Sequence, residues 1–361
     1  MLFDLLTALL AGYLAFTNQV ADRVQTWFPG HEPTAITSEG VETTEEPTAL
    51  PSQYDSEESI PRILLDNLRY QGATVVESQA EQDAYTSNPE DALVNIYCTY
   101  TTESAVRTTT GTGFFVNPDG VILTNAHVAQ FLLLEDVFET GETECIVRAG
   151  NPAAPRYKAS LLYIPPAWVR EHASVILDEA PIGTGERDYA LLYARESVSP
   201  EPMPARFPAL RPSTAELRYG AINSEITAAG YPVDPDNVFA LETDLRPETA
   251  TSSITDMFTF GSNLADLLAL RGSAVGTHGS SGGPVLDQND EVIGLITTRG
   301  DDSVDGPGSL RAITLSYVDR TITEETGFSF ARNISGNIPY RAQIFSETLQ
   351  PFLTAILARE L

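Results

Sequence analysis

Short apolar runs separated by turn residues follow one another from about residue 92 onward. The runs are rich in Val, Ile, Leu, Tyr and Phe, a composition typical of β-strands. They cover residues 93–100, 113–116, 121–124, 145–148, 190–193, 226–231, 291–296 and 312–316. Asn117-Pro118-Asp119-Gly120 predicts a turn between two of them. Because no long helices alternate with these strands, the pattern predicts an all-β barrel or sandwich rather than a doubly wound sheet.

Apolar residues at helical spacing predict a few helices around this β region. Residues 126–138 are expected to form a helix that begins beside His127. The C-terminal residues 341–361 have a helical period interrupted only by Pro351, and we expect this helix to cover one barrel. Residues 62–90 are expected to be a short helical lead-in to the β region.

The N-terminus is apolar from residue 2 to residue 16, except for Asp4 and Thr7. This stretch is shorter than the roughly 20 residues that a helix needs to cross a bilayer. No Lys or Arg precedes it, although a normal secretory signal carries one. Three interpretations of residues 1–28 stay open: a signal-anchor that holds the protein in a membrane through residues 1–20, a cleaved signal, and an interfacial or packing helix.

Residues 29–61 differ sharply in composition from the segments on either side. They are rich in Glu, Thr, Pro and Ser and contain no Lys or Arg. Such a segment cannot bury enough apolar surface to fold, so it is predicted to be a disordered, self-repelling linker. A hydrophobic helix, a linker and a folded body over residues 91–361, in this order, predict a membrane-anchored or secreted, extracytoplasmic protein.

The chain is strongly acidic. Its formal net charge is -29, and Lys158 is the only lysine. This charge repels phosphate backbones and anionic membranes, so we expect no nucleic-acid partner. Two interpretations stay open: the charge keeps the protein soluble, or it attracts basic substrates.

The two cysteines, Cys98 and Cys145, lie on either side of His127, each in a strand-like run. In an oxidising compartment they could pair as a disulfide. The alternative is two buried thiols that behave as small apolar side chains. The four histidines lack metal-ligand spacing. We therefore expect no metal and no cofactor.

Residues 277–285 place a serine in a glycine-rich bend just before an apolar run. Small neighbours expose the hydroxyl, and glycines allow backbone N–H groups to turn toward a developing oxyanion. Upstream, His127 in residues 123–128 supplies a candidate general base, and Asp188 in residues 187–192 supplies a carboxylate to orient it. The order His, Asp, Ser predicts a serine hydrolase.

These motifs resemble those of the trypsin-like, chymotrypsin-fold serine peptidases. The likeness is greatest to bacterial members, here without a PDZ domain, and it covers about residues 92–330. It rests on residues 111–114 and 123–128, on residues 188–192 and on residues 279–284. The resemblance implies two six-stranded antiparallel β-barrels with the active site at their junction, a protein or peptide substrate, and no cofactor.

The resemblance also implies a role for each motif residue. Ser281 attacks the scissile carbonyl, His127 takes its proton, and Asp188 orients the imidazole. The backbone N–H groups of Gly279 and Ser281 form the oxyanion hole. Ser280 is a rival nucleophile, but the Gly-x-Ser-Gly-Gly register favours Ser281. Many trypsin relatives carry Asp at the position of Ser280, so zymogen activation through a new N-terminal amine is not expected.

The substrate pocket is expected to be lined by Val275, His278, Thr297 and Arg299. Val275 occupies the position where pockets for basic side chains carry Asp, so no Lys or Arg preference is expected. Arg299 and His278 either favour an acidic or polar substrate residue or point to solvent. The predicted function is that of a serine endopeptidase acting through a covalent acyl-enzyme. The alternatives are a catalytically inactive, protease-like binding module and an esterase that uses the same triad.

Overall fold

The computed structural model describes residues 63–73, 85–101, 106–135, 137, 141–177, 185–233 and 243–361. The predicted N-terminal hydrophobic helix and the acidic linker lie outside the described residues. Among the described helices, none combines the length and apolar character needed to cross a bilayer.

Six antiparallel strands close into a first barrel in the order β1-β2-β3-β6-β5-β4. The strands are β1 (Leu93–Thr101), β2 (Val106–Asn117), β3 (Val121–Thr124), β4 (Glu142–Ala149), β5 (Ala154–Tyr163) and β6 (Ala190–Ser197). The predicted turn joins β2 to β3: the Asp119 N–H donates to Asn117 Oδ1 at 2.6 Å, and Gly120 has a φ of 94° that a residue with a side chain rarely adopts. β1, β3, β4 and β6 of the first barrel each contain a predicted run, β2 contains one only in its second half, and β5 was not predicted from the sequence.

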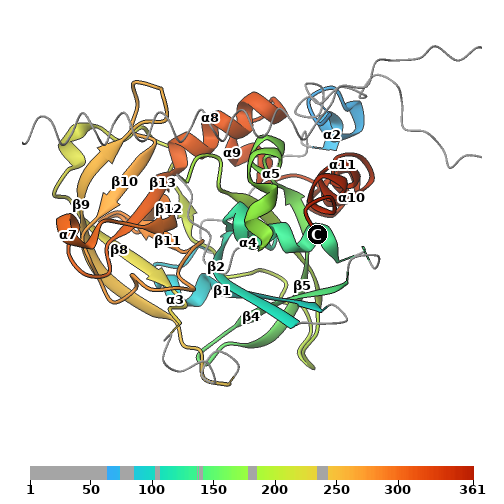
Figure 1. Cartoon of the computed structure of the whole chain (residues 1–361), viewed down its shortest axis with the longest axis horizontal. Helices are drawn as coiled ribbons and strands as arrows, with labels where there is room; N and C mark the ends of the chain where they lie inside the picture. The colour runs from blue at the N-terminus through green and yellow to red at the C-terminus, as the bar shows by residue number, and fades with distance from the viewer. Residues whose placement is uncertain are drawn as a thin grey trace, which may run out of the picture. The chain divides into compact units, whose positions relative to one another are not determined.

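A second barrel closes from β8, β9, β10, β13, β12 and β11, because β11 pairs with both β8 and β12. Its strands are β8 (Glu225–Gly230), β9 (Glu248–Phe258), β10 (Leu267–Leu270), β11 (Pro284–Leu286), β12 (Glu291–Arg299) and β13 (Leu310–Thr314). The short β7 (Arg211–Pro212) adds to β12 in parallel. Figure 1 shows the two barrels beside each other. The expected fold of two six-stranded antiparallel β-barrels is confirmed.

The helices lie around the two barrels and do not interrupt the pairing of neighbouring strands (Figure 1). They are α2 (Leu68–Ala73), α3 (Pro89–Ala92), α4 (Ala126–Ala129), α5 (Pro166–His172), α7 (Asp302–Asp305), α8 (Leu315–Thr326), α9 (Phe330–Asn333), α10 (Ile338–Thr348) and α11 (Gln350–Leu357). α10 packs on β5 and β6, so the predicted C-terminal cover lies on the first barrel.

Three details of the helices differ from the sequence-based expectation. The single C-terminal helix is two helices, α10 and α11, because Pro351 in the first turn of α11 has no N–H to continue the ladder from α10. The helix expected over residues 126–138 is shorter: α4 passes into a 3-10 helix that ends at Leu134. The strand expected over residues 312–316 ends at Thr314, whose hydroxyl accepts the N–H of Tyr317 and so starts α8.

Candidate active site

His127 and Asp188 come from neighbouring strand ends of the first barrel. β3 and β6 pair with Thr124 opposite Ala190, so the residues just after β3 and just before β6 lie side by side. Asn125 joins them, because its Nδ2 donates to the carbonyl of Asp188 at 2.8 Å. α4 begins directly after Asn125 and carries His127 in its first turn. Strand pairing thus brings together two residues that are 61 positions apart.

The carboxylate of Asp188 is buried and accepts hydrogen bonds at both oxygens. Nδ1 of His127 lies 2.7 Å from Oδ2, and the backbone N–H of His127 donates to Oδ1 at 3.0 Å. Thr297 on β12 donates its hydroxyl to Oδ2 at 2.8 Å. Because an ionised carboxylate only accepts hydrogen bonds, Nδ1 carries the proton and Nε2 of the imidazole is left to act as a base.

Two opposing effects determine the pKa of Asp188. Burial raises this pKa, whereas the imidazole of His127 and the hydrogen bonds from His127 and Thr297 lower it. The net pKa lies below the usual value of 3.8, so the carboxylate stays ionised at neutral pH. An ionised Asp188 can orient His127 and stabilise the imidazolium that forms when His127 takes a proton.

The serine loop, residues 279–283, presents one of its two serines to the surface. Ser280 is completely buried, and its hydroxyl has no hydrogen-bond partner within the described residues. Ser281 is partly exposed, and its Oγ donates a long hydrogen bond of 3.4 Å to the carbonyl of Thr297. Among the described contacts none joins Ser281 Oγ to His127; in apo enzymes such bonds are often long and tighten only with substrate. Exposure therefore favours Ser281 over Ser280 as the nucleophile.

β2 of the first barrel holds the serine loop of the second. The Thr112 N–H donates to the carbonyl of Ser281 at 2.8 Å, and the Thr112 hydroxyl donates to the carbonyl of Gly279 at 2.7 Å. Gly282 has a φ of 87°, and a Cβ on it would lie only 1.9 Å from the carbonyl oxygen of Thr112. The loop can approach β2 this closely only because position 282 has no side chain.

Two backbone N–H groups of the loop are available for an oxyanion. Within the described residues, neither the Gly279 N–H nor the Ser281 N–H has a hydrogen-bond partner. The carbonyl of His278 accepts the Val233 N–H at 2.7 Å. Because the C=O and N–H of a trans peptide point in opposite directions, this contact also fixes the direction of the Gly279 N–H.

The four residues expected to line the substrate pocket take different places. Val275 is completely buried in the core of the second barrel, and Thr297 directs its hydroxyl to Asp188. Neither side chain is therefore free to contact a substrate. His278 and Arg299 are exposed, and the Arg299 guanidinium pairs with the Asp302 carboxylate at 2.9 Å. Only His278 keeps the expected exposed position without an ion pair among the described contacts.

The two cysteines form a disulfide between β1 and β4, where the strand register places them directly opposite each other. Of the two alternatives that the sequence left open, the structure contains the pair. Thr112 and Val233 are contacts of the serine loop that sequence reasoning missed. Thr112 stands in the motif Gly111-Thr112-Gly113, so the sequence contained a signal that could have identified it. Val233 contacts the loop through its backbone N–H, and such a contact leaves no signal in the residue type.

A family model for the trypsin-like peptidase domain matches residues 111–295, a stretch that includes His127, Asp188 and Ser281. The chain belongs to the trypsin-like peptidase family. The observed pair of barrels is the chymotrypsin-like architecture expected of this family. In the described part of this trypsin-like peptidase, no group of His, Cys, Asp and Glu side chains is arranged to hold a metal ion.

Solved structures similar to this trypsin-like peptidase include the Rv3671c protease in an inactive form, at 19% identity and a TM-score of 0.38. The match covers 65% of this chain and 89% of that one. An inactive serine-to-alanine mutant of Rv3671c from M. tuberculosis H37Rv is 18% identical with a TM-score of 0.39, covering 70% of this chain and 97% of that one. A comparison with the curated proteins found no match.

Proposed function

We propose that this trypsin-like peptidase is a serine endopeptidase whose triad is His127, Asp188 and Ser281. The observation that carries the proposal is the 2.7 Å contact between His127 Nδ1 and the buried Asp188 carboxylate, together with the partly exposed Ser281. Thr297 links the two halves of the site, because its hydroxyl binds Asp188 and its carbonyl accepts from Ser281. Family membership supports a protein or peptide substrate.

The proposed reaction has two halves. Nε2 of His127 takes the hydroxyl proton as Ser281 Oγ attacks the scissile carbonyl, and the N–H groups of Gly279 and Ser281 bind the oxyanion. His127 then gives that proton to the leaving amine, which leaves an ester between Ser281 and the acyl part of the substrate. In the second half, a water attacks this ester while His127 takes its proton. His127 then returns the proton to Ser281 Oγ, and the acyl part leaves as a carboxylic acid.

A fluorophosphonate probe, which reacts with activated serines, tests the assignment. We expect wild type and Ser280→Ala to be labelled and Ser281→Ala to remain unlabelled, since Ser280 is buried. Absence of labelling in folded wild type, or labelling that survives in Ser281→Ala, would contradict the proposal. Absence of labelling in folded wild type is the result expected of a catalytically inactive binding module. Turnover of peptide and ester substrates by a labelled preparation then distinguishes a peptidase from an esterase.

We further propose an extracytoplasmic location, with residues 1–20 as the membrane anchor and residues 29–61 as the tether. The composition of these segments supports the proposal, as does the Cys98–Cys145 disulfide, which persists in oxidising compartments. Fractionation of cells that produce the full chain should place it in the membrane fraction, and a chain without residues 1–28 should leave that fraction. A full chain found only in the cytoplasm would refute the proposal.

A further inference from the structure

The two residues on either side of Asp188 are both held by α8. The Arg187 N–H donates to the hydroxyl of Tyr317 at 3.1 Å, and the Arg187 guanidinium pairs with the carboxylate of Glu325. On the other side, the hydroxyl of Tyr189 shares a hydrogen bond of 2.8 Å with Thr321 Oγ1. α8 is remote in sequence from this segment, so these contacts are tertiary and not local.

The α8 residues that make these contacts are spaced four apart: Tyr317, Thr321 and Glu325. A spacing of four puts side chains on one face of an α-helix, one above the other. All three are buried, with exposures of 5%, 6% and 7%. We call these three residues the α8 platform; it faces the segment that carries Asp188.

Arg187 has a backbone conformation that needs such support. Its φ is 55°, a left-handed conformation that costs a residue with a side chain about 1–2 kcal/mol and persists only where the surroundings impose it. The turn continues through the carbonyl of Arg187, which accepts the N–H of Tyr189 at 2.9 Å. Asp188 lies between the two held residues. The direction of its side chain therefore depends on this turn.

Glu325 is the charged centre of the platform. One carboxylate oxygen accepts from Arg187, and the other accepts the hydroxyl of Tyr163 at 2.5 Å. Burial raises the pKa of this carboxyl, although Tyr163 and Arg187 oppose the shift. A buried carboxylate needs such hydrogen-bond partners. By pairing with Arg187, Glu325 in turn holds the residue next to Asp188 in place.

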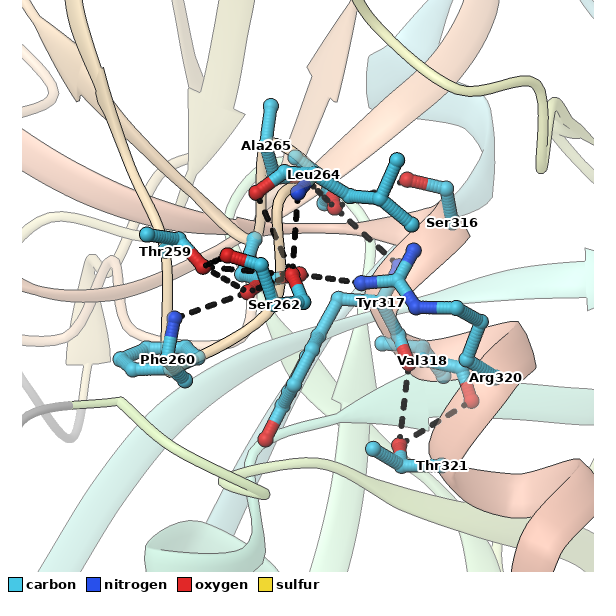
Figure 2. A network of polar contacts seen from close by, with 12 residues as sticks. Thr259, Phe260, Ser262, Leu264, Ala265, Ser316, Tyr317, Val318, Arg320 and Thr321 are labelled. Carbon is cyan, nitrogen blue, oxygen red and sulfur yellow. Dashed lines mark hydrogen bonds and ion pairs between the residues drawn. The ribbon is translucent and has the colours of Figure 1, made fainter.

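α8 is itself fastened to the second barrel. Arg320 pairs with the buried carboxylate of Asp266, which also accepts the N–H of Phe260 at 2.8 Å and the hydroxyl of Ser262 at 2.7 Å. Figure 2 shows Arg320 reaching from α8 toward this loop, with Tyr317 and Thr321 on the same helix. A helix held at Asp266 gives the turn at Arg187 a fixed support on the second barrel.

We propose that the α8 platform positions Asp188 for catalysis, with Glu325 as the main positioning residue. The inference rests on the proposed serine-peptidase function, because it assigns a support to the orienting carboxylate of that triad. The platform residues are buried, and their described hydrogen bonds to this segment go to Arg187 and Tyr189 rather than to the Asp188 carboxylate. The platform acts by holding Arg187 and Tyr189, so that the Asp188 carboxylate stays within hydrogen-bond distance of His127 Nδ1.

Glu325→Gln tests the proposal, since it keeps the volume but removes the charge that pairs with Arg187. Glu324→Gln is the matched control, because Glu324 is exposed and its carboxylate lies 3.9 Å from the same guanidinium. We expect kcat of Glu325→Gln to fall about tenfold, as for a small misplacement of a catalytic group, with KM nearly unchanged. Glu324→Gln should stay within about twofold of wild type, as expected for an exposed pair.

A proton NMR spectrum gives a second readout that does not need activity. The proton between His127 Nδ1 and Asp188 is expected to resonate far downfield in wild type and in Glu324→Gln. In Glu325→Gln, measured at a temperature well below unfolding, this resonance should broaden or shift upfield. Asp188→Asn, which removes the ionised acceptor, identifies the resonance.

A Glu325→Gln protein that keeps both kcat and a sharp resonance would overturn the proposal. So would a fall in kcat that only follows the unfolded fraction. If Glu325→Gln fails to fold, Tyr317→Phe replaces it as the test. This substitution removes the hydroxyl that accepts the Arg187 N–H, and kcat and the resonance of the His127 Nδ1 proton are measured in the same way. An inactive wild type with a resonance that still responds to Glu325→Gln would refute the proposed peptidase function but not the positioning role.

Discussion

Thr297→Val removes one hydrogen bond from the buried Asp188 carboxylate and leaves the shape of the side chain almost unchanged. Thr297 is 2% exposed and Asp188 is 4% exposed, so no solvent can replace the lost donor without a rearrangement. The hydroxyl of Thr297 donates to Oδ2 at 2.8 Å. The two contacts from His127, at 2.7 and 3.0 Å, remain.

The magnitude follows from the charge of the acceptor. A hydrogen bond to a charged group contributes about 1.5–3 kcal/mol, so the free energy of unfolding should fall by an amount in this range. Because one of the donors that lower the pKa of Asp188 is gone, this pKa rises toward its usual value. We expect kcat to fall about tenfold, equivalent to about 1.4 kcal/mol, since the imidazole keeps its partner but in a less fixed orientation.

Urea unfolding and steady-state kinetics measure the two effects. Thr298→Val is the matched control, because the neighbouring hydroxyl of Thr298 bonds only to the local carbonyl of Arg299 at 3.2 Å within the described contacts. We expect this control to change the free energy of unfolding by less than about 0.5 kcal/mol, as is usual for substitutions away from buried networks. If Thr297→Val is as stable and active as Thr298→Val, the hydroxyl does not support Asp188 and the reasoning fails.

Three further predictions follow from single features of the fold. Gly282→Ala should lower the free energy of unfolding by about 2 kcal/mol or more, because alanine would have to adopt a left-handed φ and its Cβ would clash with the carbonyl of Thr112. Urea unfolding together with probe labelling would detect this loss of stability, and a variant as stable as wild type would rule out the close approach. Reduction of Cys98–Cys145, which closes a separation of 47 residues, should lower the free energy of unfolding by about 4 kcal/mol, and unfolding curves with and without reductant should coincide only if the bond is absent. The folded-state pKa of Asp188 lies below 3.8, so the carboxylate contributes stability above pH 3.8, and this contribution is lost as the pH falls through the folded-state pKa. The free energy of unfolding should therefore fall less steeply with decreasing pH in Asp188→Asn than in wild type, and equal slopes would contradict the lowered pKa.

Much of the β architecture could be predicted from local patterns. The runs that became β1, β3 and β12 were visible as short apolar segments, and the turn at residues 117–120 was visible from its Asn, Pro, Asp and Gly. α8 was missed because its apolar and polar positions mix, and because residues 312–316 also suit a strand. Its start depends on the Thr314 hydroxyl accepting the N–H of Tyr317, a contact that strand-like composition conceals.

The candidate site was predicted only as three separate motifs. The sequence contains His127, Asp188 and Ser281 in an order typical of serine peptidases, but spacing along a chain cannot say which atoms meet. The register of β3 against β6 brings the first two together, and β2 holds the loop that carries the third. Val275 and Thr297 were expected to line the substrate pocket. Instead, Val275 is buried in the core of the second barrel, and the buried Thr297 donates its hydroxyl to Asp188.

The sequence by itself determined the chemistry available to this protein: a base, a carboxylate and a serine among glycines, on short strands that form barrels. These properties are local, since they depend on residue type and on neighbours within a few positions. Only the tertiary structure decided that Ser280 is buried and Ser281 partly exposed, that Cys98 lies opposite Cys145, and that α8 supports the turn around Asp188. Those outcomes depend on strand register and on packing between segments far apart in the chain, so local patterns of residues do not reveal them.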